Sequence, residues 1–343
     1  MFNVQYTLAT PAPVTCLALH ASRLFAGSDD GSLRVYDLTT RRVSKAIRAL
    51  GDEVSSIIYD PRSDNLWLAT GPSIMVFSLG SSKMVMNLDD AIASRQLGVN
   101  DEDAVNQLAI NSNASHLAFC LDSGAVGVLA IAPNHEITIM KTTHENISSC
   151  VHFIPDRPNE LLSFGYDHNI LHFEYRQQTI LSRRQITPVA QGDGMSLSPP
   201  FVICSDISSS GIAAAGTADG QLWVGSGGEK VPSRQQGRKK SRKWQGLDQE
   251  YELLQRIAEG PIVALCFVEA RVLAYSTLLG GVNLCRVLSE PNEPPRIKVI
   301  SQKQTTVVHK VNALTMGDNQ LYIAGLSKDI KGVIETWEYT VHE

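Results

Sequence analysis

An all-β, seven-bladed propeller is the fold that this sequence predicts, and three observations predict it. A unit of three short strands recurs seven times along the chain, and its inner strands consist mostly of Val, Ile, Leu, Ala and Cys. No amphipathic helix separates the strand groups, which argues against a parallel α/β fold. Units of this length with four strands are typical of propeller blades. We therefore expect residues 1–343 to form one closed domain.

The first unit shows the pattern most clearly. It contains an apolar strand, a second strand ending at Gly27-Ser28, an acidic turn and a third strand ending at Tyr36-Asp37. A fourth, more polar strand is expected at the outer edge of each blade, where it faces solvent. In the second unit we assign this strand to residues 84–88. The blades are expected to begin near Val14, Val54, Val105, Ile147, Phe201, Ile262 and Val311.

The two ends of the chain are incomplete in a complementary way. The last unit has three strands and no fourth, whereas residues 3–9 form an alternating strand that belongs to no blade. If this N-terminal strand completes the last blade, the ring closes without an open sheet edge. The sequence therefore predicts closure by the N-terminal strand.

The composition is that of a globular protein with a substantial core, because 43% of the residues are hydrophobic and 19% are charged. No apolar run approaches the ~20 residues that span a bilayer, and the N-terminus does not match a secretory signal, so we expect no membrane association. The six cysteines show no paired spacing and are expected to be reduced, buried thiols. Such thiols favour a location in the nucleus and cytoplasm.

The acidic turns and the aromatic-acidic strand ends, such as Tyr36-Asp37, resemble the WD-repeat family. In that family a His, a Ser or Thr, the turn Asp and a Trp form a buried hydrogen-bond set. The resemblance assigns His144, Ser163 and Asp167 to this set in the fourth blade, where Phe173 replaces the Trp. It is strongest over residues 144–175 and 205–224 and weakest in the last two blades, which implies a divergent member.

The end of the third strand in the fourth blade carries a second resemblance. Its residues Phe173, Glu174, Tyr175 and Arg176 are similar to the Trp-Asp-x-Arg box of WD-repeat substrate receptors of cullin–RING ubiquitin ligases. The resemblance implies that Phe173, Glu174 and Arg176 form a surface on the bottom face that binds the ligase adaptor. Arginine suits such a contact because its planar fork makes bidentate hydrogen bonds. The alternative is an ordinary turn with one charged residue.

A basic insertion, residues 226–247, separates the third and fourth strands of the fifth blade. Its composition buries too little surface to fold alone, so a solvated loop is one interpretation. The other is a nuclear-import signal or a patch for an acidic partner, and an exposed Trp244 would favour contact with a partner. Nucleic-acid binding is disfavoured because a single aromatic residue provides little stacking surface. The basic loop consists of Arg234, Arg238, Lys239, Lys240, Arg242, Lys243 and Trp244.

Acidic residues gather in the turns between second and third strands and in the connections that enter each blade, which together form the top face. Such a surface would attract a basic polypeptide, for instance a histone tail or a ribosomal-protein extension, although solvated acidic loops are the alternative. The candidates are Asp52, Glu53, Asp101, Glu102, Asp103 and Glu145. A smaller basic group, mostly in the seventh blade, comprises Lys141, His309, Lys310, Lys328 and Lys331.

Catalytic motifs do not emerge from the sequence. His168 and His172 have an HxxxH spacing, but they fall in a strand–turn–strand context rather than on one helical face. We expect no catalytic residues, no cofactor, no metal and a monomeric, non-enzymatic interaction scaffold. The resemblance favours a substrate receptor or adaptor of a cullin–RING ligase. The alternative is a binding module or chaperone for basic polypeptides.

Overall fold

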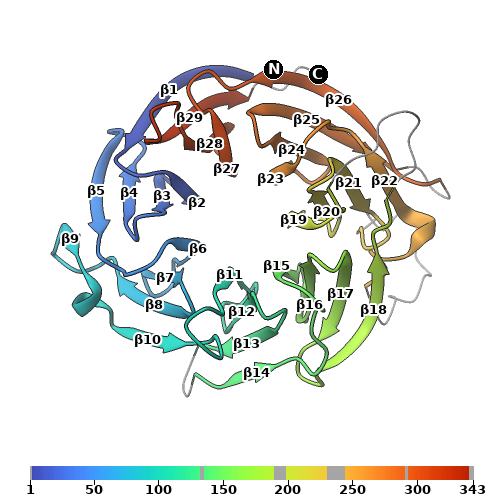
Figure 1. Cartoon of the computed structure of the whole chain (residues 1–343), viewed down its shortest axis with the longest axis horizontal. Helices are drawn as coiled ribbons and strands as arrows, with labels where there is room; N and C mark the ends of the chain where they lie inside the picture. The colour runs from blue at the N-terminus through green and yellow to red at the C-terminus, as the bar shows by residue number, and fades with distance from the viewer. Residues whose placement is uncertain (1, 132–134, 189–197, 230–243, 290–292, 340–343) are drawn as a thin grey trace.

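In a computed structural model, the chain forms seven sheets arranged around one axis, as Figure 1 shows. The structure describes residues 2–131, 135–188, 198–229, 244–289 and 293–339. Apart from one two-residue strand, all neighbouring strands within the sheets are antiparallel and follow one another from the axis outward. The predicted all-β, seven-bladed propeller is confirmed.

Four strands, called a to d from the axis outward, build each blade. The a strands are β2 (Val14–His20), β6 (Val54–Asp60), β11 (Val105–Ile110), β15 (Ser148–Ile154), β19 (Val202–Ile207), β23 (Ile262–Glu269) and β27 (Lys310–Gly317). The b strands are β3 (Arg23–Ser28), β7 (Asn65–Thr70), β12 (His116–Leu121), β16 (Arg157–Gly165), β20 (Ala213–Thr217), β24 (Val272–Thr277) and β28 (Gln320–Leu326). The c strands are β4 (Leu33–Asp37), β8 (Ser73–Ser78), β13 (Val126–Ala130), β17 (Asn169–Glu174), β21 (Gln221–Gly225), β25 (Gly281–Leu288) and β29 (Gly332–Tyr339). The d strands are β5 (Arg42–Ile47), β10 (Ala93–Gln96), β14 (Ile137–Ile139), β18 (Thr179–Gln185), β22 (Glu252–Arg256), β26 (Arg296–Gln304) and β1 (Phe2–Thr10).

The N-terminal strand β1 closes the ring, as predicted. It pairs antiparallel with β29 from Phe2 opposite Tyr339 to Thr10 opposite Gly332, and it is the d strand of the seventh blade. Leu8 is buried in the seam between the seventh and first blades. The first and last strands, β1 and β29, therefore lie side by side in one sheet (Figure 1).

The outer strand of the second blade differs from the prediction. Residues 84–88 do not form it, because Val85–Met86 is β9, a short strand that pairs in parallel with β5 of the first blade. Met86 is buried against Ile47, which anchors this connection across the two blades. The d strand is β10, whose four residues are all exposed, so its sequence carries no apolar signal.

Hydrophobic side chains from neighbouring blades fill the seams between them. The seam of the first and second blades, for example, joins Phe25 and Val35 to Leu66 and Leu68. Equivalent clusters fill the other six seams, including the one at the closure. Burial of this apolar surface stabilises each blade against both neighbours, so we expect the ring to unfold as one cooperative unit.

A β-bulge recurs near the start of every a strand, at its second residue in six blades and at its third in the seventh. The register between strands a and b shifts there in all seven blades. A bulge re-aims the extra side chain, and in five blades that side chain donates a hydrogen bond to the first carbonyl of an adjacent a strand. Each bond contributes ~1 kcal/mol. The donors and acceptors are Thr15 and Val54, Ser55 and Val105, Asn106 and Ser148, Ser149 and Val202, and Asn312 and Val14.

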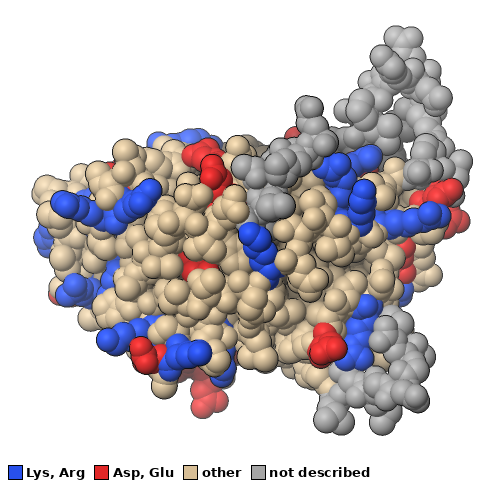
Figure 2. Space-filling view, turned by 90° about the horizontal axis from the view of Figure 1, so that it is seen from above, with Lys and Arg blue, Asp and Glu red and all other residues tan. Residues whose placement is uncertain are grey.

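The described helices are two single 3-10 turns, η1 (Leu88–Asp90) and η2 (Gln249–Tyr251). Neither is long and apolar enough to cross a membrane. Seen edge-on, the disc carries scattered charges of both signs that are separated by uncharged surface (Figure 2). Among the described residues on that edge, no large surface of one sign stands out.

Candidate functional site

Four carboxylates from the first three blades form an acidic rim on the top face: Asp29, Asp52, Glu53 and Asp122. Partial burial raises the pKa of Glu53, and the nearby carboxylates of Asp52, Asp29 and Asp122 raise it further. The pKa of Asp29 is also raised, by burial and by Asp30. Carboxylates that raise the pKa of a neighbouring carboxylate in this way favour a bound cation, because its charge offsets their repulsion.

An aromatic pair lies beside the acidic rim. The rings of Tyr166 and Phe201 stack with centroids 5.2 Å apart, and both side chains are half-buried. Burial raises the pKa of Tyr166, and Cys150 and Asp122 raise it further, so the rim carboxylate Asp122 lies within electrostatic range of this side chain. Aromatic faces and carboxylates together suit a Lys or Arg side chain. The sequence reasoning missed this pair, although the turn position of Tyr166 and the entry position of Phe201 both lie on the top face.

The acidic run at residues 101–103 divides into two roles. Asp101 and Glu102 are exposed, as expected of a binding surface. Asp103 is buried, and its carboxylate accepts hydrogen bonds from the backbone N–H groups of Val99 and Ser123. The prediction that Asp103 belongs to an acidic surface is therefore wrong, because this side chain holds two loops together.

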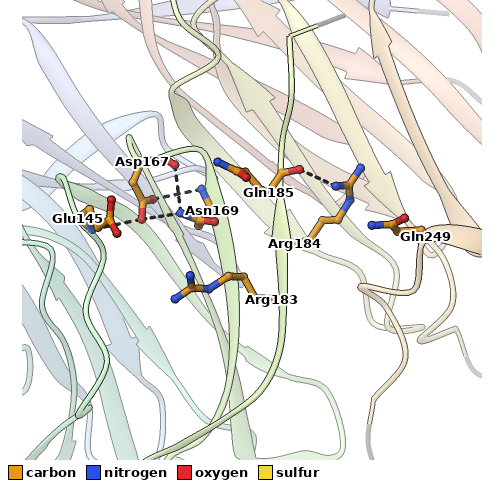
Figure 3. Close-up of a pocket in the computed structure, with 7 residues that line it drawn as sticks. All are labelled: Glu145, Asp167, Asn169, Arg183, Arg184, Gln185 and Gln249. Carbon is orange, nitrogen blue, oxygen red and sulfur yellow. Dashed lines mark hydrogen bonds between the residues drawn. The ribbon is translucent and has the colours of Figure 1, made fainter.

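Glu145 lies in a polar hollow of about 460 Å³ between the fourth and fifth blades (Figure 3). Arg183 and Arg184 also line it, so the surroundings of Glu145 are of mixed charge. Arg184 is held by both carboxylate oxygens of Glu252, at 2.7 and 2.6 Å. Glu145 is exposed, but the basic neighbours make it a weaker attractor for a basic ligand than the acidic rim.

The fourth blade contains the hydrogen-bond set that the family resemblance implied. His144 bonds Asp167 through Nδ1 at 2.8 Å and Ser163 through Nε2 at 2.7 Å. Burial raises the pKa of Asp167, but hydrogen bonds from His144 and Asn169 outweigh it and lower that pKa to about 2. The side chains of His144, Ser163 and Asp167 therefore hold the top-face turn of the blade through hydrogen bonds to one another, which is a structural role.

On the bottom face, the structure separates Arg176 from its neighbours in sequence. Phe173 is fully buried in the seam between the third and fourth blades, so the prediction that it contacts a partner is wrong. Glu174 is half-buried and accepts a 2.7 Å hydrogen bond from the backbone N–H of Gln177. Arg176 is exposed, and the residues that the structure describes include no ion-pair partner for it. Its charge does reach His116 of the third blade, whose pKa is lowered by burial and then by Arg176.

Trp244 corrects the interpretation of the basic insertion. The side chain is buried, and its indole N–H donates to the carbonyl of Gly211 at 3.3 Å. Its ring meets that of His172 edge-on at 5.5 Å, and His172 bonds Glu160 at 2.9 Å. Trp244 is therefore an anchor for one end of the insertion and not an exposed contact. The six basic residues of the loop, Arg234, Arg238, Lys239, Lys240, Arg242 and Lys243, lie outside the described residues.

Metal-binding geometry is absent from the described part of the chain, where no three His, Cys, Asp or Glu side chains come together. His168 packs against Phe201 with ring centroids 5.5 Å apart, whereas His172 lies between Glu160 and Ser182. The two histidines of the HxxxH spacing therefore serve separate contacts.

Comparison with known proteins agrees with this architecture. The family model "WD domain, G-beta repeat" matches residues 2–37. The "WD repeat-containing protein 53 homolog" of Dictyostelium discoideum is 25% identical over 234 residues. That match spans 62% of this chain and 61% of the relative, which is less than two thirds of the relative's length. The β-propeller domain of Cps50 (Swd1) from Myceliophteria thermophila has a similar fold, with a TM-score of 0.73 at 12% identity over 99% of this chain and all of that domain.

Proposed function

We propose that this chain, a divergent relative of WD-repeat proteins, is a non-enzymatic scaffold that holds a basic segment of a partner protein against the acidic rim of its top face. The observation that carries the proposal is the convergence of Asp29, Glu53 and Asp122 from three blades onto shared electrostatic surroundings. A closed ring keeps these side chains in place, so a ligand loses less entropy on binding than it would on mobile loops.

The aromatic pair extends the proposal to the chemistry of the ligand. Tyr166 and Phe201 supply stacked π faces beside Asp122, so a Lys or Arg side chain can contact a ring and a carboxylate together. The shared rim favours two or more basic residues over one, because Glu53 and Asp29 belong to different blades. A Lys- and Arg-rich segment of a protein meets both requirements.

Charge reversal at the acidic rim tests this function. The Asp29→Lys, Glu53→Lys double variant is expected to weaken binding of a fluorescein-labelled Arg- and Lys-rich peptide at least tenfold, because each reversal replaces an attraction of ~0.5–1 kcal/mol by a repulsion. Fluorescence anisotropy at low and high salt measures the effect, which salt should reduce. Glu136→Lys, an exposed residue at a bottom-face turn, is the matched control. Equal affinity of the double variant and the control would refute the proposal.

A second candidate function, docking to a cullin–RING ligase adaptor, rests on Arg176. Its guanidinium is exposed on the bottom face, opposite the acidic rim, so a client and a ligase could bind together. Two other arginines on this face, in the first and second blades, are engaged: Arg23 pairs with Asp64 at 3.0 Å, and Arg62 donates to the carbonyls of Asn113 and Ala114. That the partner is a ligase adaptor is inferred from the resemblance of residues 173–176 to the Trp-Asp-x-Arg box.

Arg176→Ala is expected to abolish co-purification of the ligase adaptor with the epitope-tagged chain and to leave the melting temperature unchanged, because the side chain is exposed. Arg176→Lys should restore little binding if the contact is bidentate, since an ammonium cannot form the planar fork. Arg95→Ala, an exposed residue on the outer strand of the second blade, is the control. Undiminished co-purification with Arg176→Ala would contradict the ligase function and leave the basic-ligand function untouched.

We further propose that the basic loop is a nuclear-import signal. Trp244 and the ion pair of Glu229 with Arg271 fix the described residues on either side of residues 230–243. We accordingly propose that the protein occupies nucleus and cytoplasm.

A further inference from the structure

Three large apolar side chains are exposed on the top face of the sixth and seventh blades. Leu279 is 64% exposed, Val307 is 44% exposed and Ile330 is 71% exposed. Leu279 and Ile330 lie in the b–c turns of these blades, and Val307 lies in the connection between the blades. We call these three residues the apolar patch.

Backbone hydrogen bonds bring the three segments of the patch side by side. Thr305 donates to the carbonyl of Gly280 at 2.9 Å, which ties the connection to the turn that carries Leu279. His309 donates to the carbonyl of Leu326 at 2.8 Å, which ties it to the turn that carries Ile330. Val307 lies between these two hydrogen-bonded residues, so the connection that carries it is tied both to the turn of Leu279 and to the turn of Ile330.

A buried carboxylate makes the connection rigid. Glu335 is fully buried in β29, and its Oε1 accepts hydrogen bonds from the backbone N–H groups of Thr306, Val307 and Val308. Its Oε2 accepts one from the indole N–H of Trp337 at 3.0 Å. The exposed side chain of Val307 is thus presented on a loop whose backbone is held from inside the blade, and rigid presentation lowers the entropy lost on binding.

Ile330 has a backbone conformation that its side chain disfavours. Its φ is +59°, and a β-branched residue in the left-handed region is an outlier. Asn or Gly would fit this turn without strain and without exposing an apolar group. Backbone strain of this kind gathers at functional positions, so an isoleucine at this position points to a use for its exposed side chain.

Three lysines frame the apolar patch. Lys328 and Lys331 flank Ile330 in its turn, and Lys310 follows the connection into β27. All three are exposed, and the described residues include no ion-pair partner for any of them. Asp329 is the acidic residue within the turn. The three lysines outnumber it, so the surroundings of the patch are basic.

We propose that the apolar patch and its lysines bind an acidic amphipathic segment of a partner protein, in which Asp or Glu residues flank aliphatic side chains. The aliphatic groups cover Leu279, Val307 and Ile330, and the carboxylates meet the lysines. This surface goes beyond the acidic rim, because it takes a ligand of opposite charge on other blades of the same face. An anionic membrane fits less well, because a flat bilayer against this face would also meet the acidic rim over the first three blades.

Fluorescence anisotropy with a designed probe tests the proposal. The probe is a fluorescein-labelled peptide Ser-Glu-Leu-Glu-Leu-Glu-Ser, compared with peptides that carry Lys in place of Glu or Ser in place of Leu. Only the first should bind the intact protein. Ile330→Asn is expected to weaken binding about tenfold, because the contact of one large aliphatic side chain is lost. Lys328→Glu with Lys331→Glu should weaken it a further tenfold and reverse its dependence on salt, because the acidic probe then meets two carboxylates in place of two ammonium groups.

Ile330→Asn also separates binding from folding. Asn tolerates the left-handed conformation, so this variant should keep or raise the melting temperature while it loses the probe. Val299→Ser, at a 55% exposed residue on the outer strand of the sixth blade, is the matched control and should bind the probe as wild type does. Failure of the probe to bind, equal binding of the Lys-containing peptide, or wild-type affinity of Ile330→Asn would each overturn the proposal. The proposal would also be overturned, in favour of a membrane, if the protein did not bind the probe but sedimented with phosphatidylserine vesicles and Ile330→Asn abolished that sedimentation.

Discussion

Removal of residues 1–10 is expected to lower the melting temperature by roughly 10 °C, which corresponds to several kcal/mol for a protein of this size. The deletion removes β1 and with it the whole hydrogen-bond ladder to β29. It also removes Leu8 from the seam that contains Leu24 and Ile334. Because every blade is stabilised by both neighbours, the loss should affect unfolding of the entire ring in scanning calorimetry.

Two controls distinguish the closure from a general effect of mutation at the N-terminus. Thr7→Ala changes an exposed side chain of β1 and should leave the melting temperature within about 2 °C of wild type. A peptide of residues 1–12, added in excess to the truncated protein, should recover much of the lost stability, because it can pair with the vacated edge of β29. A truncated protein that melts with the intact one would show that β1 is dispensable.

Glu335→Ala is expected to lower the free energy of unfolding by ~3 kcal/mol or more. The substitution removes the carboxylate that accepts hydrogen bonds from the backbone N–H groups of residues 306–308 and from the indole N–H of Trp337. Glu335→Gln should cost less, since its amide oxygen can still accept the three backbone bonds while its NH2 group opposes the Trp337 N–H.

Urea titration measures the free energy of unfolding of both variants. An unchanged slope of this free energy against urea concentration shows that the unfolded state is unaffected. Glu338→Ala on the same strand is the control, because Glu338 is exposed and its hydrogen bond to Gln5 is on the surface. If Glu335→Ala and Glu338→Ala have equal midpoints, Glu335 does not hold the connection.

The family resemblance identified the blade-four network correctly but not the surface around it. His144, Ser163 and Asp167 lie in one blade within 23 residues, so the order of strands and turns is enough to bring them together. Phe173 and Arg176 are equally close in sequence, yet one is buried in a seam and the other is exposed. That difference depends on where the third blade packs, which no local pattern records.

The same limit explains the corrections at Trp244, Asp103 and residues 84–88. The indole N–H of Trp244 donates a hydrogen bond to the carbonyl of Gly211, and the carboxylate of Asp103 accepts one from the backbone N–H of Ser123. The strand β9 leaves its own blade to pair with β5. In each case the partner lies in another loop or blade, which the sequence around the residue does not record.

By itself the sequence determined the all-β class, the seven blades and the closure by the N-terminal strand. It could do so because strand periodicity and strand count are local properties that repeat. The tertiary structure alone decided which side chains meet across blades: the bulge-directed ring of hydrogen bonds, the acidic rim with its aromatic pair, and the apolar patch held by Glu335. The physical reason is that closing the ring brings together residues from different blades, and only their final distances set which charges, rings and carbonyls interact.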